Sequence, residues 1–213
     1  MKPFLLAISV ALAAAAAPGC ANLARSRDLG NPKVPPKVTA MQVCSNCHGI
    51  DGNSISPNFP RLAGQPKAYL VNELNGFHAR HRADQAGMDY MWGIAHNLTP
   101  EQIDGLADYF SGQKGKAIAA RGRDAQRAEV GRQIYEKGLP EKETPPCGIC
   151  HGKNGEGLQA IPRLASQHSH YILKELEEFK ETDARPGTPM KQVSHKMSPE
   201  EMQNVAVYVQ SLP

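Results

Sequence analysis

The sequence predicts an all-α protein built from two tandem domains. Three observations support this prediction: motifs recur about one hundred residues apart, helical periodicity follows two proline-containing caps, and no segment has convincing strand character. The 213 residues are enough for one mid-sized domain or two small ones. Aromatic residues make up only 6% of the chain, so side chains alone would fill two cores thinly. We therefore expect another group to contribute to each interior.

A repeated block spans most of the chain. Residues 44–49 read Cys-Ser-Asn-Cys-His-Gly, and residues 147–152 read Cys-Gly-Ile-Cys-His-Gly. Residues 60–65 and 162–167 share the pattern Pro-Arg-Leu-Ala-(Gly/Ser)-Gln. The order of matches never breaks, which indicates a tandem duplication with insertions confined to loops. Further matches pair Tyr69 with Tyr171, Leu74 with Leu176, Phe77 with Phe179, Met91 with Met190, and Tyr109 with Tyr208.

The first residues have the pattern of an export signal. A basic start precedes an apolar run over residues 4–17, which is too short to span a bilayer core but typical of a signal peptide. Residues 17–20 read Ala-Pro-Gly-Cys, similar to a lipobox, and a lipidated Cys20 would tether the mature protein to a membrane. Cleavage after Ala21 is the alternative. We predict a signal peptide over residues 1–21, a flexible segment over residues 22–38, and a location outside the cytoplasm.

The last helix of each copy begins at a capping box with proline at its first position. Residues 99–102 read Thr-Pro-Glu-Gln, and residues 198–201 read Ser-Pro-Glu-Glu. Behind each cap, apolar residues recur at the spacing of one helix face. They are Ile103, Leu106, Ala107 and Phe110 in the first copy, and Met202, Val205, Ala206 and Val209 in the second.

Earlier helices complete each copy. We predict them over residues 69–77, 126–137 and 171–180, whereas Pro35-Pro36 permits only a short helix before the first cysteine motif. The first domain is then expected at residues 39–113, the second at residues 128–213, and a linker at residues 114–127.

The net charge of +3 comes from segments outside the two domains. Residues 1–38 and 114–128 each carry +4, whereas residues 39–113 carry −3 and residues 129–213 carry −2. A nucleic-acid surface would need a basic patch on a folded face. The charge distribution therefore excludes nucleic acid and favours partners with some basic surface.

The Cys-x-x-Cys-His motifs predict two covalently bound haem c groups. Two thiols three positions apart, followed at once by a histidine, match haem attachment: the thiols add to the porphyrin vinyl groups and the histidine binds the iron. A thioredoxin-like redox pair would need a βαβ setting, which is absent, and a zinc site shared by the motifs would not require the histidines. The residues are Cys44, Cys47 and His48 in the first copy, and Cys147, Cys150 and His151 in the second.

Two matched pairs could supply the second axial ligand of each iron. Met91 and Met190 precede the capped helices by eight residues, and thioether ligation would raise the potential and close the iron to substrate. His96 and His195 also match each other, and bis-histidine ligation would lower the potential. The residues alone leave both pairs open, together with simple core packing by methionine. The other histidines have no counterpart between copies and are expected to face solvent: His78, His81, His168 and His170.

Each iron-binding histidine needs a group that orients its ring. A carbonyl oxygen that accepts the Nδ1 proton would do so. Pro60 and Pro162 lie 12 and 11 residues downstream and are the candidates, because proline stiffens a loop. Pro57 is a weaker candidate, and a plain turn proline is the alternative. Arg61 and Arg163 could pair with haem propionates.

Together these motifs resemble the dihaem cytochrome c4 family over about residues 40–213. The resemblance rests on the two cysteine motifs, the two Pro-Arg-Leu-Ala segments, the Tyr…Leu…Phe helices and the methionines before the caps. It implies two tandem class I cytochrome c domains packed about a pseudo-twofold axis, and it favours Met91 and Met190 over the histidine pair as ligands. The chain departs from the family in the short segment before Cys44 and in Ser166, which replaces a glycine.

The resemblance implies a periplasmic electron carrier, not an enzyme, in a bacterial respiratory chain. Its partners would be a quinol-oxidising complex as donor and a terminal oxidase as acceptor. The alternative is a cytochrome electron-transfer subunit of a flavoprotein dehydrogenase, such as a flavocytochrome c sulfide dehydrogenase. A dihaem peroxidase or thiosulfate dehydrogenase would need an exchangeable iron site, which methionine ligation removes. Acidic Asp84 and Asp89 near Met91, against Arg185 and Lys191 near Met190, would separate the two potentials.

Overall fold

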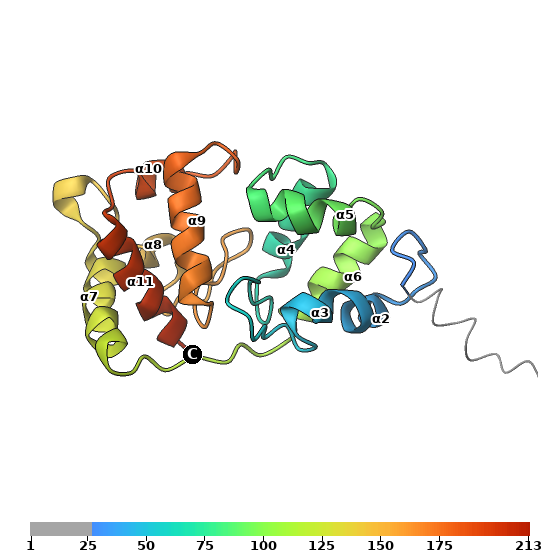
Figure 1. Cartoon of the computed structure of the whole chain (residues 1–213), viewed down its shortest axis with the longest axis horizontal. Helices are drawn as coiled ribbons and strands as arrows, with labels where there is room; N and C mark the ends of the chain where they lie inside the picture. Colours follow the sequence, from blue (N-terminus) through green and yellow to red (C-terminus); the bar gives the residue numbers. More distant parts are fainter. Residues whose placement is uncertain (1–26) are drawn as a thin grey trace, which may run out of the picture.

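Helices supply the regular structure of residues 27–213, the part of the chain that this computed structural model describes (Figure 1). These residues contain two isolated bridges, Leu139 with Thr144 and Leu158 with Ile161, and no strand, so the all-α prediction is confirmed. No described helix is long and apolar enough to cross a membrane. The predicted signal peptide and Cys20 lie outside the described residues.

The first domain begins with a short helical run that leads into the first cysteine motif. Its pieces are continuous, and Pro35 limits the run on its N-terminal side, as predicted. In chain order the elements are α2 Pro36–Thr39, η1 Ala40–Cys44 (a π-helix), α3 Ser45–His48, α4 Lys67–His78, η2 Gly87–Met91 (a π-helix), α5 Trp92–Ala95 and α6 Pro100–Ser111.

The second domain repeats this order with a longer first helix. That helix, α7, begins three residues before the predicted position. It follows Gly122, the last residue of the connecting segment, which has a φ of 58°. The elements are α7 Arg123–Lys137, η3 Pro140–Lys142 (a 3-10 helix), α8 Gly148–His151, α9 Ser169–Glu181, α10 Met190–Ser194 and α11 Pro199–Ser211.

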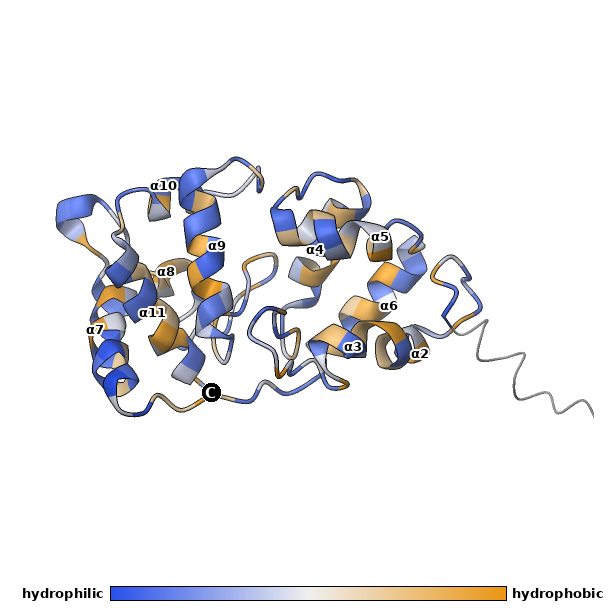
Figure 2. Cartoon of the chain, viewed as in Figure 1, coloured by the Kyte–Doolittle hydropathy of each residue, from blue (hydrophilic) through white to orange (hydrophobic). Residues whose placement is uncertain are grey.

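Both capping boxes are present. The Thr99 hydroxyl accepts the Gln102 N–H and the Gln102 side chain accepts the Thr99 N–H, and Ser198 and Glu201 exchange the same bonds at α11. The capped helices pack against the other long helices of their domains, α6 against α4, and α11 against α7 and α9. Figure 2 shows α7 as mostly hydrophilic, while α6 and α11 carry apolar stretches. Each domain therefore has its own core, built around its capped helix.

The two domains contact each other through matched residues of the repeat. The Gln65 side chain donates to the Arg163 carbonyl (2.8 Å) and accepts the Arg163 N–H (3.0 Å). In the reverse direction, the Gln167 side chain donates to the Arg61 carbonyl (3.0 Å) and accepts the Arg61 N–H (2.8 Å). This reciprocal exchange is what a pseudo-twofold arrangement of the two copies produces.

His168 belongs to the same interface, and its predicted solvent-facing position is wrong. The ring is buried, and its Nε2 lies 3.0 Å from the Ser54 hydroxyl and 2.9 Å from the Ser54 carbonyl of the other domain. Burial lowers its pKa, which favours the neutral ring. The remaining histidines of that group, His78, His81 and His170, are exposed.

Candidate haem-binding sites

The first cysteine motif ends in a buried imidazole whose Nε2 keeps its lone pair. His48 is the last residue of α3, is 7% exposed, and has its Nδ1 2.8 Å from the Pro60 carbonyl. Because a carbonyl only accepts, Nδ1 carries the proton and Nε2 keeps its lone pair. Burial lowers the pKa of His48, and the bond to Pro60 opposes this only in part, so the neutral, metal-binding form is favoured.

The second motif repeats this geometry. His151 ends α8, is 8% exposed, and has its Nδ1 2.9 Å from the Pro162 carbonyl. Burial again lowers its pKa. The glycine after each histidine is required: Gly49 and Gly152 have φ of 78° and 84°, a region that disfavours other residues.

Burial holds the first thiol of each motif in its neutral form. Burial raises the pKa of the Cys44 thiol to about 12 and that of Cys147 to about 11, which is the opposite of the activated thiolate of a redox pair. Cys44, Cys47, Cys147 and Cys150 form no disulfide. No three His, Cys, Asp or Glu side chains within residues 27–213 are arranged to hold a metal ion.

The structure brings the methionines, not the second histidine pair, to the cores. Met91 ends η2 and packs against the core that also contacts Cys44, and Met190 begins α10 and packs against the core that contacts Cys147. His96 and His195 are exposed.

Exposed apolar side chains beside the motifs fit an attached porphyrin. In the first domain, Cys47, Ile55 and Phe59 line a hollow of about 330 Å³, and Ile55 is 95% exposed. Its counterpart in the second domain, Leu158, is 65% exposed. Large exposed apolar residues usually mark a binding surface, and in the first domain Ile55 lines the same hollow as Cys47.

The two arginines predicted to pair with propionates lie at the domain interface. Arg61 donates from Nη1 to the Ser166 carbonyl (3.1 Å) and from Nε to the Ser54 carbonyl (3.3 Å). Arg163 donates from Nη2 to the Pro213 carbonyl, while its Nε is buried without a hydrogen-bond partner.

Comparison with known proteins shows the family of this chain. The model of the cytochrome c family matches residues 37–114 and again residues 128–213. Cytochrome c4 of Azotobacter vinelandii is 36% identical over 180 residues, which cover 80% of this chain and 84% of the relative. The solved structure of Acidithiobacillus ferrooxidans cytochrome c4 superposes with a TM-score of 0.74 at 38% identity, over 79% of this chain and 98% of that one. This chain belongs to the dihaem cytochrome c4 family.

As a cytochrome c4, the protein is an electron carrier with two class I cytochrome c domains, and each domain binds one haem c covalently. A second kind of relative is also similar to it. The thiosulfate dehydrogenase electron acceptor of Stutzerimonas stutzeri is 31% identical over 173 residues, which cover 79% of this cytochrome and 78% of the relative.

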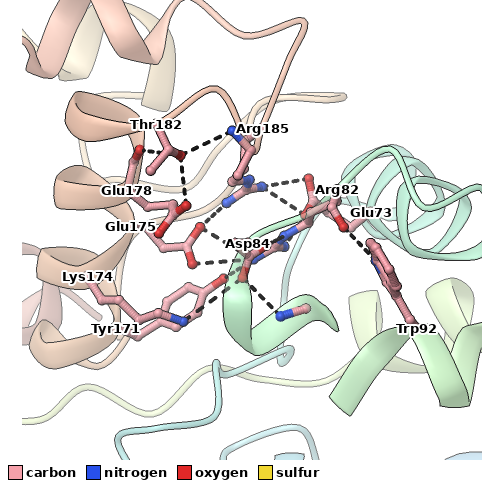
Figure 3. A network of polar contacts seen from close by, with 12 residues as sticks. Glu73, Arg82, Asp84, Trp92, Tyr171, Lys174, Glu175, Glu178, Thr182 and Arg185 are labelled. Carbon is pink, nitrogen blue, oxygen red and sulfur yellow. Dashed lines mark hydrogen bonds and ion pairs between the residues drawn. The ribbon is translucent and has the colours of Figure 1, made fainter. Parts of the chain in front are cut away.

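The sequence did not predict the network of charged side chains that lies between the domains. Asp84 and Arg185, expected near Met91 and Met190 as separate charges, both belong to this network together with Arg82, Glu73 and Glu175 (Figure 3). The one signal in the sequence is that Glu73 and Glu175 are matched positions of the repeat, four residues after the matched tyrosines.

Proposed function

We propose that this cytochrome c4 carries single electrons in a bacterial periplasmic respiratory chain, from a quinol-oxidising complex to a terminal oxidase. The observation that carries the proposal is the same in both domains: the cysteine motif ends in a buried imidazole, and a methionine packs against the core that the first cysteine of the motif also contacts. The bound haem iron supplies a one-electron Fe(III)/Fe(II) couple. The export signal supports the periplasmic location.

The chain's own residues would supply both protein ligands of each iron. We assign His48 with Met91 to the first iron, and His151 with Met190 to the second. The Pro60 and Pro162 carbonyls fix the imidazole rings, and core packing fixes the methionines. Rigid protein ligands would suit a carrier, because the surroundings of the iron would then change little between its two oxidation states.

Arg163 is the better placed of the two arginines for a propionate. Its Nε is a buried donor that lacks an acceptor, and a buried unpaired donor costs about 1–3 kcal/mol. A propionate oxygen of the second haem would remove this cost. The Arg61 guanidinium is already bound to carbonyl oxygens on Nε and Nη1.

A redox titration with optical spectra tests the proposal. The oxidised holoprotein should show the long-wavelength methionine-to-iron charge-transfer band, and Met91→His and Met190→His should each remove part of it and lower one potential. His96→Gln and His195→Gln are the controls and should leave the band intact. A wild-type protein without the band would overturn the methionine assignment.

The relationship to thiosulfate dehydrogenase electron acceptors favours a second candidate function, as the cytochrome partner of a dehydrogenase. A dehydrogenase of sulfur compounds, such as thiosulfate dehydrogenase or flavocytochrome c sulfide dehydrogenase, would then be the donor. Stable co-purification with such an enzyme, together with reduction by it faster than by a quinol-oxidising complex, would support this function. Peroxide turnover by the isolated protein would instead indicate an enzyme.

Lipidation of Cys20 would keep the carrier at a membrane, and cleavage after Ala21 would release it. We propose the tether on the Ala-Pro-Gly-Cys pattern alone. The mass of the mature N-terminus distinguishes the two outcomes.

A further inference from the structure

Four charged side chains form a closed ionic ring across the domain interface (Figure 3). Glu73 of α4 and Glu175 of α9 each bind both Arg82 and Arg185. The pairs Arg82–Glu175 (3.3 Å) and Arg185–Glu73 (2.8 Å) cross between the domains, while the other two lie within one domain. We call these four residues the interdomain ring.

The interdomain ring is buried. The side chains of Arg82 and Arg185 are 12% and 11% exposed, and that of Glu175 is 7% exposed. Each guanidinium also lies over a phenylalanine ring of its own domain, at 4.6 Å for Arg82 and 4.9 Å for Arg185. Because buried charges are tolerated only when paired, removal of one member leaves the others without compensation.

Only the first domain extends the interdomain ring to its methionine helix. Asp84 accepts a hydrogen bond from Arg82 Nε (2.7 Å) and another from the N–H of Gly87 (3.1 Å), so it caps the helical segment that begins at residue 85. The Trp92 indole donates to the Arg82 carbonyl (2.7 Å). Arg82 is thus bound at two points to the segment that carries Met91, which lies at the end of a π-helical turn.

The second domain lacks these connections. Between Arg185 and Met190 the chain has four fewer residues than between Arg82 and Met91, and reads Pro-Gly-Thr-Pro with no acidic residue. The N-cap residue of α10 is Pro189, which makes no side-chain cap, and the Met190 N–H donates to the Thr188 hydroxyl within the same domain (3.3 Å). Lys191 follows Met190 where Trp92 follows Met91, and its ammonium pairs with exposed Asp183 at 2.6 Å.

We propose that Arg82 is a positioning residue through which contact between the domains holds Met91 on the first haem iron, while Met190 is held independently. The inference rests on the methionine ligation of the proposed function. This inference predicts that the strength with which Met91 is held on the first haem iron depends on a side chain of the other domain. The strength with which Met190 is held on the second iron does not.

Glu175→Gln tests this dependence, because it removes a crossing charge while keeping the shape of the side chain. The readout is the imidazole concentration that displaces methionine, followed by the charge-transfer band of the oxidised holoprotein. A Met190→His background isolates the Met91 signal, and a Met91→His background isolates the Met190 signal. We expect Met91 to be displaced at about tenfold lower imidazole concentration, equivalent to about 1.4 kcal/mol, and Met190 to change by less than about twofold, the usual error of additivity.

Glu178→Gln is the matched control. It removes the same charge from the same helix, but the Glu178 carboxylate accepts from the Thr182 hydroxyl, outside the interdomain ring. It should leave both displacement concentrations unchanged. Trp92→Phe removes the hydrogen bond from the indole to the Arg82 carbonyl without changing the charge. In a Trp92→Phe background, Glu175→Gln should therefore lower the imidazole concentration that displaces Met91 by a smaller factor.

The outcomes separate this inference from the proposed function. If Glu175→Gln weakens Met190 alone, both methionines equally, or neither, the positioning role of Arg82 is wrong even though the methionine assignment stands. If the wild type shows no charge-transfer band, the methionine assignment itself is wrong. Should Glu175→Gln not accumulate as holoprotein, Arg185→Lys keeps the charge but loses the forked geometry, and the same asymmetry is expected.

Discussion

At the scale of single residues, one backbone carbonyl determines the tautomer of each iron-binding imidazole. The oxygens of Pro60 and Pro162 can only accept, so each ring presents an unprotonated Nε2 from a buried position. A hydrogen bond at Nδ1 also makes the imidazole a stronger donor, and a stronger donor favours ferric iron. The stiffness of the proline loops therefore bears on the potentials as well as on stability.

Pro60→Gly should raise the reduction potential of the first haem and leave the second unchanged. A more flexible loop weakens the Nδ1 bond to His48, and the weaker donor stabilises ferric iron less. Optical redox titration measures both potentials. Pro57→Gly is the control: each change should lower the free energy of unfolding by about 1 kcal/mol through the unfolded chain, but only Pro60→Gly should move a potential. Equal shifts in the two variants would mean that this carbonyl has no special role.

At the scale of helices, the first and last helices of each domain pack closely against each other. A Cβ on Gly131 of α7 would lie 2.0 Å from the Asn204 carbonyl of α11, and one on Gly105 of α6 would lie 2.3 Å from Pro36 Cγ of α2. In each domain, one glycine therefore lets the first and last helices approach at van der Waals distance. The two copies place this glycine on opposite partners of the helix pair.

Gly131→Ala should destabilise the second domain by about 1–3 kcal/mol, the usual cost of overpacking, because α7 must move away from α11. Thermal unfolding of the holoprotein followed by circular dichroism measures the effect. Gly93→Ala is the matched control: Gly93 lies within α5, and a methyl group there would have open space around it, so alanine should stabilise the helix by up to about 1 kcal/mol. A stabilising Gly131→Ala would show that the helices can separate without cost.

The cap of the Met91 helix predicts a pH dependence. Burial raises the pKa of Asp84, but the positive charge of Arg82 outweighs burial and lowers the pKa overall. Arg185 and Lys174 also face this carboxylate. A lowered pKa contributes stability above the unfolded value, near 3.8, that is lost as the pH falls through the folded value. We expect Asp84→Asn, which keeps an acceptor for the Gly87 N–H, to lower the free energy of unfolding by about 1.5–3 kcal/mol at pH 7, the value of a hydrogen bond to a charged group.

The difference in free energy of unfolding between Asp84→Asn and the wild type should disappear below the pKa that Asp84 has in the folded protein. There the wild-type carboxyl group is protonated and also neutral. Urea unfolding across the acidic range measures this difference, and Asp89→Asn, at an exposed position nearby, should show no such deficit. A deficit that is the same at every pH would mean that the charge of Asp84 contributes nothing.

At the scale of the whole molecule, the sequence predicts what is local and misses what the two domains build together. The caps, the helix periodicity and the spacing of Pro60 from His48 are all set within one copy, and the structure has them where expected. His168 and the interdomain ring depend on which surfaces the copies bury against each other. Polar residues at such an interface have the same pattern in the sequence as solvated ones, so the sequence alone cannot distinguish them.

Burial of the interdomain ring also predicts how the domain arrangement responds to salt. Exposed pairs are screened over about 3 Å at 1 M salt, whereas the guanidinium groups of Arg82 and Arg185 are about nine-tenths buried. We therefore expect the radius of gyration of the holoprotein, measured by small-angle X-ray scattering, to stay constant between low and 1 M salt. The double variant Gln65→Ala, Gln167→Ala loses four neutral interdomain hydrogen bonds, worth about 1 kcal/mol each. It should expand at every salt concentration and expose its connecting segment to protease. A wild type that expands with salt would instead show that surface charges hold the domains together.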